Sequence, residues 1–414
     1  MQKDEQNEKI AEPAVAQKRV QKPTAQDWFE KGYHAQHTNR LEEACVCYSQ
    51  VIELEKRHTP AYNNWGETLL ELAKMRKDEN LFKRAFKKYA KAVSLEPRNP
   101  LLLNNWANAL ADYGKVMGKP GIFQDAFRKY MQALRYAPRD AAIYDNWGMA
   151  LSELALMTGN ESVFLEAIEK YAIVEKFHPD YVPVYYKWAN LLSRLAMLKK
   201  DEAVFQGAFE KYAKAVELQP DNALAYNDWG VALSDLAGLK EDDKLFEESY
   251  EKFTKAVELQ DGFPAFYYNW GNALSAQGDI RKDEKLFEES LTKYKKAMEL
   301  QPGNAFIVYN YALAISDLAR LKGTLTQDAA QIEELLKQVV ALAGDTSAIY
   351  NLACLYALTG RKDDALRALK TALMNRHPIT WQELEEEADL ASLKGDADFI
   401  ALMETYFPGK KFSE

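Results

Sequence analysis

Asparagine side chains recur in this sequence at intervals of 41 residues. One column holds Asn64, Asn105, Asn146, Asn269, Asn310 and Asn351, and it is interrupted by Lys187 and Asp228. A second column, three residues further along, holds Asn108, Asn190 and Asn272. An asparagine amide carries both a donor and an acceptor, which matches the backbone amide of an extended peptide. These columns predict a surface that holds a polypeptide without reading much of its sequence.

Two more columns accompany the asparagines. Six residues after the first column come Ser152, Ser193, Ser234, Ser275 and Ser316. The next position holds Glu71, Asp112, Glu153, Asp235 and Asp317, interrupted by Arg194. A row of carboxylates favours a partner that carries Lys or Arg. Two plainer interpretations stay open, in which the asparagines hydrogen-bond locally and the carboxylates form a solvated face.

The elements that must position these columns are marked by tryptophan. Trp residues are spaced by 41 residues, and Tyr311 and Leu352 take the same position in the last two periods; the series is Trp65, Trp106, Trp147, Trp188, Trp229 and Trp270. A fixed period of this length predicts a solenoid in which each repeat packs on its neighbours. We number positions so that Trp65 is position 7 of repeat two, and the columns above are positions 6, 9, 12 and 13.

Each repeat has the pattern of two helices. In repeat two, Trp65 and Leu69 fall on one face of a first helix, and Phe82 and Tyr89 fall on one face of a second, which Pro97 ends. The four polar columns lie on the opposite face of the first helix. Position 8 is always Gly or Ala, which predicts that the paired helices cross too closely for a larger side chain.

This pattern resembles the tetratricopeptide repeat (TPR) family, whose 34-residue unit combines an aromatic, Leu-Gly and Tyr with Ala, Phe or Tyr, Ala and Pro. The resemblance implies an all-α solenoid, a right-handed superhelix of about nine helical hairpins with a C-terminal helical cap. Repeats one and nine have about 34 residues and repeats two to eight have 41, so we expect roughly one extra turn on each helix. The predicted organisation is a disordered polar tail over 1–24, the array over 25–380, and capping helices with a short tail over 381–414.

Composition narrows the function classes. The chain has 414 residues, a net charge of −9 and a pI near 5.4, which disfavours a nucleic-acid partner. Three cysteines give no disulfide framework, and no apolar run is long enough for a membrane span. The polar start of the chain does not have the pattern of a signal peptide. We therefore expect a cytoplasmic protein.

The sequence offers little for catalysis. It contains no Walker A loop, no HExxH and no GxSxG. His34 and His37 have no evident third ligand, and Cys45 and Cys47 point to different helix faces, so no metal site is expected. We predict a protein that is not an enzyme and needs no cofactor.

The predicted function is a scaffold or adaptor whose concave groove binds an extended polypeptide segment, with partners that include Lys- or Arg-bearing segments. The predicted peptide-binding residues are Asn64, Asn105, Asn108, Asn146, Asn190, Asn269, Asn272, Asn310, Ser152, Ser193, Ser234, Ser275, Glu71, Asp112, Glu153 and Asp235. The alternatives are a self-assembling homo-oligomeric scaffold and, less favoured, an RNA-binding helical repeat. The family's clamp for a C-terminal carboxylate is not expected, because only Lys187 and Arg194 are basic in these columns.

Overall fold

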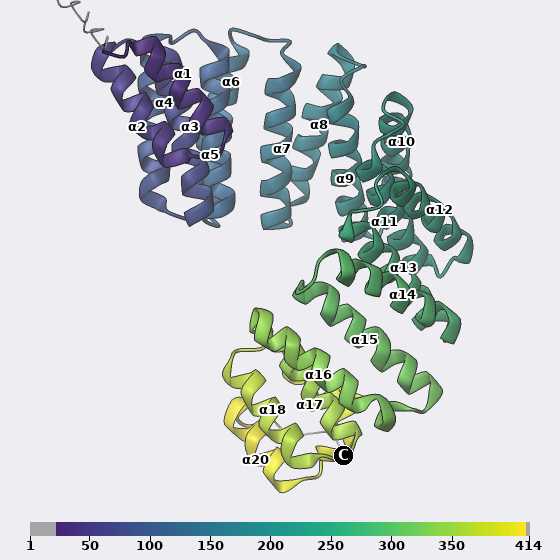
Figure 1. Ribbon diagram of the computed structural model, residues 1–414. Coiled ribbons are helices and arrows are strands. Elements are labelled where there is room, and N and C mark those ends of the chain that lie inside the picture. The colour runs from purple at the N-terminus through teal and green to yellow at the C-terminus, as the bar shows by residue number, and fades with distance from the viewer. Residues whose placement is uncertain (1–21, 411–414) are drawn as a thin grey trace, which may run out of the picture. The chain divides into compact units, whose positions relative to one another are not determined.

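A computed structural model describes residues 22–410, and within them the regular secondary structure is helical throughout (Figure 1). This confirms the all-α prediction; the predicted disorder of the tail falls almost entirely outside the described residues. Contacts divide the chain into an N-terminal part, Met1–Lys170, and a C-terminal part, Tyr171–Glu414, which are described separately. The N-terminal helices are α1 (Ala25–His37), α2 (Leu41–Leu54), α3 (Thr59–Arg76), α4 (Glu79–Leu95), α5 (Pro100–Val116), the 3₁₀ turn η1 (Pro120–Ile122), α6 (Phe123–Leu134) and α7 (Ala141–Thr158).

Helix α8 (Glu161–Phe177) spans the boundary. The C-terminal helices are α9 (Val182–Lys199), α10 (Glu202–Leu218), α11 (Ala223–Lys240), α12 (Asp243–Leu259), α13 (Pro264–Arg281), α14 (Glu284–Leu300), α15 (Ala305–Lys322), α16 (Leu325–Ala343), α17 (Thr346–Leu358), α18 (Lys362–Met374), α19 (Trp381–Glu386), η2 (Ala388–Leu393) and α20 (Ala397–Tyr406).

Consecutive helices pack in pairs, such as α3 with α4 and α11 with α12, and each pair is one repeat. The first helices of successive repeats also touch, α3 with α5 and α5 with α7 in the N-terminal part, and α9 with α11 and α11 with α13 in the C-terminal part. The surface that these first helices share carries positions 6, 9 and 13, and we call it the first-helix face. It is the surface on which any ligand of the polar columns must lie.

The hairpin tips follow from the sequence at the helix ends. Several second helices begin behind an aspartate whose side chain accepts backbone N–H groups; Asp78 caps α4, Asp201 caps α10 and Asp242 caps α12. The paired helices have 13 and 14 residues in α1 and α2, against 18 and 17 in α3 and α4. The additional residues of the 41-residue repeats therefore lengthen both helices.

The interior of each hairpin is built around position 8. A Cβ placed on Gly66 would lie 3.0 Å from the ring of Tyr89, and one on Gly271 would lie 2.8 Å from the ring of Tyr294. Both rings come from the second helix of the same repeat and are buried. The predicted close approach is confirmed, with an aromatic side chain rather than the opposite backbone as the nearest group.

Each repeat tryptophan is covered by a lysine 23 residues further along. The Nζ to ring-centroid distance is 3.4 Å for Lys88 over Trp65 and 3.3 Å for Lys293 over Trp270. The other pairs are Lys129–Trp106, Lys170–Trp147, Lys211–Trp188 and Lys252–Trp229. A cation over an indole face is attracted by the ring quadrupole, so this contact ties the second helix of a repeat to its first.

The C-terminal segment closes the apolar interior of the last repeats. Leu384 in α19, Leu390 in η2 and Phe399 in α20 are fully buried and join the same cluster as residues of α15 to α18. Without these side chains the last hairpin would expose its apolar side to water. Over residues 22–410, no helix is both long enough and apolar enough to cross a membrane.

Candidate peptide-binding face

Five of the six position-6 asparagines hydrogen-bond to the repeat before their own, whereas the sixth, Asn64, accepts from Asn63 Nδ2 of its own helix. In the N-terminal part, Asn105 Nδ2 donates to Asn63 Oδ1 and Asn146 Nδ2 donates to Asn104 Oδ1, both at 3.1 Å. In the C-terminal part, Asn269 Nδ2 donates to Asn227 Oδ1 at 3.1 Å. Asn310 and Asn351 donate in the same way to the hydroxyls of Tyr268 and Tyr309. These asparagines therefore link repeats, and the link sets the orientation of each amide.

The amide oxygens are not used in that link. None of the described residues donates a hydrogen bond to Oδ1 of Asn105 or of Asn269. Both side chains are half-buried. A fixed amide whose oxygen has no internal donor remains able to accept an N–H from outside.

The position-9 asparagines are held by the second helix of their own repeat. The tyrosine hydroxyl donates to the asparagine Oδ1 in the pairs Tyr130–Asn108, at 2.6 Å, and Tyr294–Asn272, at 2.8 Å. Tyr212 makes the same bond to Asn190. These oxygens are occupied internally, so only the amide N–H groups of this column remain for a ligand.

The position-12 serines bond to the backbone of their own helices. Ser152 donates to Gly148 O, Ser193 to Ala189 O and Ser234 to Val231 O. Ser275 instead donates to Ser290 Oγ of α14 at 3.2 Å. The serines lie close to the joint between the two helices, with Ser193 buried, so they are the least accessible of the predicted columns.

The acidic column has two different environments. Asp112 is paired with Lys74 at 2.9 Å and Glu153 with Lys115 at 2.6 Å, in each case with position 16 of the preceding repeat. Glu71 is half-buried and Asp317 is exposed, and partial desolvation raises the pKa of both carboxyls. The sequence did not predict the pairing, although Lys74 and Lys115 occupy the same repeat position.

A cavity of about 230 Å³ lies between α5 and α7 in the N-terminal part. Its lining includes Asn108, Tyr130 and Asn146 together with Asp112, Lys115 and Glu153. The ion pairs just described satisfy its carboxylates from within the fold. We call this the α5–α7 cavity.

The equivalent cavity in the C-terminal part lies between α9 and α11, and we call it the α9–α11 cavity. It holds about 180 Å³ and is lined by residues that include Asn190, Arg194, Tyr212, Asp228 and Asp235. Each of these lies 82 residues, or two repeats, after its counterpart in the α5–α7 cavity. Asn269 of α13 also lines it. Burial raises the pKa of Asp235 to about 6, and the positive charge of Arg194 opposes this only in part.

Apolar side chains alternate with the asparagines of position 9, a feature that the sequence analysis did not use. From Asn108 onward the column reads Asn108, Met149, Asn190, Val231, Asn272 and Leu313. Val231 lines the α9–α11 cavity and a neighbouring one of about 370 Å³, and Leu313 lines one of about 380 Å³ near α15 and α17. The face thus offers apolar contact at every second repeat.

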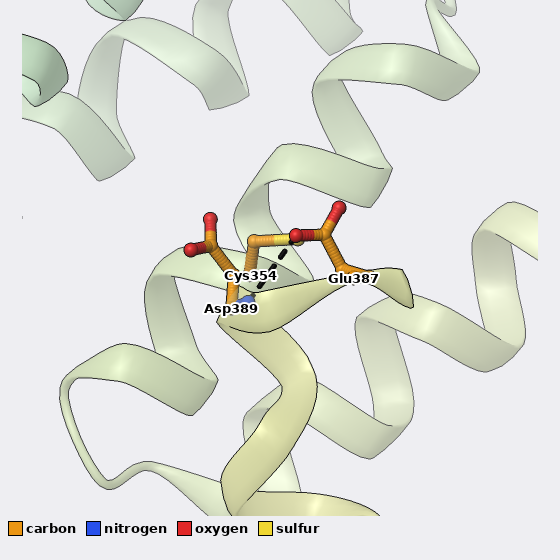
Figure 2. A group of neighbouring side chains, drawn as sticks. All are labelled: Cys354, Glu387 and Asp389. Atoms are coloured by element: carbon orange, nitrogen blue, oxygen red, sulfur yellow. Dashed lines mark hydrogen bonds between the residues drawn. The ribbon is translucent and has the colours of Figure 1, made fainter. Parts of the chain in front are cut away.

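One group of side chains in the C-terminal part has the spacing of metal ligands. Possible ligand atoms of Cys354, Glu387 and Asp389 lie within 4.8 Å of one another (Figure 2). However, Arg320 donates two hydrogen bonds to Asp389, and Tyr350 donates to Glu387. Burial raises the pKa of the Cys354 thiol, which keeps it protonated. The group is an internally paired network around Arg320 and does not have the chemistry of a metal centre.

No family model matches this sequence, and no curated protein matches it. The chain is similar to the solved structure of yeast Tom70, with 13% identity and a TM-score of 0.40 over 87% of this chain and 93% of that one. It is also similar to the C-terminal part of a TPR repeat-containing protein from Cytophaga hutchinsonii, with 17% identity and a TM-score of 0.44 over 69% and 98%. YrrB, described as a TPR protein with an unusual peptide-binding site, shares 18% identity and a TM-score of 0.35 over 53% and 94%.

The architecture itself rests on this chain's own residues. The aromatic period, the small residue at position 8 and the paired helices all recur along the described part of the chain. Together they make it an array of paired helices, the architecture that the resemblance to tetratricopeptide repeats implies.

Proposed function

We propose that this protein is a non-catalytic scaffold that binds an extended polypeptide segment on its first-helix face. The observation that carries the proposal is the position-6 amide, whose nitrogen is fixed by the neighbouring repeat and whose oxygen has no donor within the described structure at Asn105 and Asn269. An extended main chain supplies N–H donors at regular spacing along its length, so a segment bound on either part can donate to such an acceptor.

The apolar side chains of position 9 supply a second element of this proposal. Val231 and Leu313 border cavities in the C-terminal part, and Met149 borders the α5–α7 cavity. A bound segment with apolar residues at intervals would bury them there, while its main chain bonds to the amides. Affinity would come from this burial and selectivity from the polar groups around it.

The carboxylates add a preference for basic segments where they have no internal partner. Because Lys74 and Lys115 already neutralise Asp112 and Glu153, the attraction should come from Glu71 and Asp317. Rim charges act mainly on the association rate and are screened by salt. Binding that is indifferent to salt, between low and physiological ionic strength, would remove this part of the proposal.

The experiment is a selection of random dodecapeptides displayed on phage against the purified full chain, followed by affinity measurements with synthetic copies. Asn105→Ala combined with Asn269→Ala should weaken binding of the selected peptides several-fold, because a peptide bound on either part of the chain loses an acceptor. Asn375→Ala, at an exposed residue beyond the end of α18, is the matched control. Circular dichroism checks that the variants remain folded. Unchanged affinity in the folded double variant would place the binding surface elsewhere.

A further inference from the structure

The α9–α11 cavity contains a polar frame whose members already satisfy one another. The carboxylate of Asp228 accepts the Tyr186 hydroxyl at 2.7 Å, Asn190 Nδ2 at 2.9 Å and Asn227 Nδ2 at 2.7 Å. Tyr212 donates to Asn190 in turn. With three donors on one carboxylate, Asp228 is a fixed part of the wall and has little capacity left for a ligand.

Two charged groups in the same cavity are left out of this frame. Arg194 on α9 and Asp235 on α11 both line it, and neither forms a hydrogen bond or an ion pair with another described residue. They act on each other only through space, and the positive charge of Arg194 favours the ionised form of Asp235. The cavity therefore presents one strong donor group and one acceptor group to whatever enters it.

The chemistry of the occupant follows from this arrangement. A Lys or Arg side chain would be attracted by Asp235 and repelled by Arg194, and an Asp or Glu side chain would meet the reverse. An apolar side chain would leave both groups desolvated and without partners, which is costly. A carboxamide satisfies both, because its N–H₂ donates to the carboxylate while its oxygen accepts from the guanidinium.

We propose that the α9–α11 cavity selects an Asn or Gln side chain of the bound polypeptide, with Arg194 and Asp235 as the specificity-determining residues. This rests on the proposed function, since it assigns one side-chain position to the segment bound on the first-helix face. We assign a side chain as the occupant because the cavity lies between two packed helices and its volume of about 180 Å³ suits a single side chain.

The chain itself supplies a way to close the cavity. At the position of Met197, repeats two and three carry Lys74 and Lys115, and these pair with position 13 of the next repeat. Lys74 reaches an aspartate, Asp112, at 2.9 Å. A lysine at 197 should reach Asp235 in the same way and remove its carboxylate from the cavity.

The test uses the dodecapeptides selected with the full chain, and then synthetic peptides in which single residues are changed. The wild-type protein should select peptides with a fixed Asn or Gln, and replacing that residue by Leu, Lys or Glu should weaken binding about ten-fold or more. Met197→Lys, Arg194→Met and Asp235→Asn should each reduce this discrimination while keeping affinity for the rest of the peptide. Met131→Lys, an exposed position on α6, is the matched control.

The outcomes separate this inference from the proposed function. Selected peptides that carry a fixed Lys, Arg, Asp or Glu instead, or an amide preference that persists in Met197→Lys, would overturn the inference and leave peptide binding intact. A folded protein that selects no peptide at all would remove both. Three variants of different charge are used, so that poor folding of any one does not decide the result.

Discussion

The α5–α7 and α9–α11 cavities are built on the same scaffold and differ in charge. Both have an asparagine and a tyrosine joined by a hydrogen bond, Asn108 with Tyr130 and Asn190 with Tyr212. Between the two, Asp112 is replaced by Arg194 and Asn146 by Asp228, and the position of Lys115 is taken by Met197, which lines the neighbouring cavity of about 370 Å³. In the first cavity each carboxylate is paired with a lysine. In the second, the positive charge is Arg194, at the position equivalent to Asp112, and Asp235 has no ion-pair partner within residues 22–410. Arginine in place of Asp112 and methionine in place of Lys115 thus leave Arg194 and Asp235 without partners among the described residues, whereas the added carboxylate of Asp228 is satisfied by its three donors.

Whether the two cavities depend on the same packing can be tested by removing the tryptophan that stacks on the tyrosine of each cavity. Trp147 stacks on Tyr130 with 15° between the rings, and Trp229 stacks on Tyr212 with 11°. Trp147→Ala and Trp229→Ala should each lower the free energy of unfolding by about 3–4 kcal/mol, because each leaves a large void. Urea unfolding followed by hydrogen exchange measures the loss and locates it. Markedly unequal losses would show that the two cavities do not share one scaffold.

The sequence predicted this scaffold because its signals are periodic. The tryptophan spacing indicates a packed ring, Gly66 indicates a close approach of two helices, and Asp78 indicates a helix cap. Each of these signals can be recognised in the sequence without knowing which residues it contacts. The lysine that covers each tryptophan has an equally clear period, but its meaning depends on how the two helices of a hairpin are rotated.

The hydrogen bonds and ion pairs that distinguish one cavity from the other were harder to predict. That Asn105 bonds to Asn63, or that Lys115 neutralises Glu153, depends on contacts between repeats that one repeat does not encode. A departure such as Arg194 could be seen in the sequence as a break in a column. Its consequence appears only when Arg194 and Asp235 are placed in the same cavity, with Met197 in the neighbouring cavity that Asp235 also lines.

The unpaired carboxylate should make stability depend on pH. Burial raises the pKa of Asp235 to about 6, above its ordinary value of 3.8. A raised carboxyl pKa means that ionisation costs stability; the cost is fully present above about pH 6 and disappears as the pH falls towards the ordinary value. Asp235→Asn, which cannot ionise, should therefore stabilise the protein by about 1–2 kcal/mol at pH 8 and have little effect near pH 4.

Thermal unfolding at the two pH values measures this effect. The groups facing Asp235 are Arg194 on α9 and Asp228 on its own helix, while α13 contributes the uncharged Asn269. The matched control is Glu153→Gln in the α5–α7 cavity, which removes a paired carboxylate and should not stabilise the protein at either pH. Destabilisation by Asp235→Asn at pH 8 would mean that its charge is compensated by a partner.

The charge difference itself can be exchanged between the cavities. Lys115→Met should lower the free energy of unfolding by up to about 1 kcal/mol, since Lys115 and Glu153 form a partly exposed ion pair. Met197→Lys should stabilise the protein by a comparable amount through a new pair with Asp235. Both effects should shrink at high salt, which distinguishes them from packing changes at the same positions. Denaturant unfolding at low and high salt measures them, and effects of the same sign in both variants would contradict the exchange.

The smallest expected effect concerns position 8, which is alanine in the repeats that supply Tyr130 and Tyr212 and glycine in some of the other repeats. Ala107 and Ala189 occupy this position in the repeats that contain Tyr130 and Tyr212, whereas Gly271 occupies it beneath Tyr294. Gly271→Ala gains about 1 kcal/mol in helix propensity, but its Cβ would lie 2.8 Å from the ring, so Tyr294 must shift.

Since the alanine repeats keep the hydrogen bond from tyrosine to asparagine, the shift should be small and the net change in unfolding free energy should stay within about 0.5 kcal/mol. Thermal unfolding of Gly271→Ala beside Ala189→Gly measures both directions. A loss above about 2 kcal/mol in Gly271→Ala would mean that the ring cannot move. Glycine would then be required in that repeat for packing, and the alanine repeats around the two cavities would differ from the others in helix spacing as well as in charge.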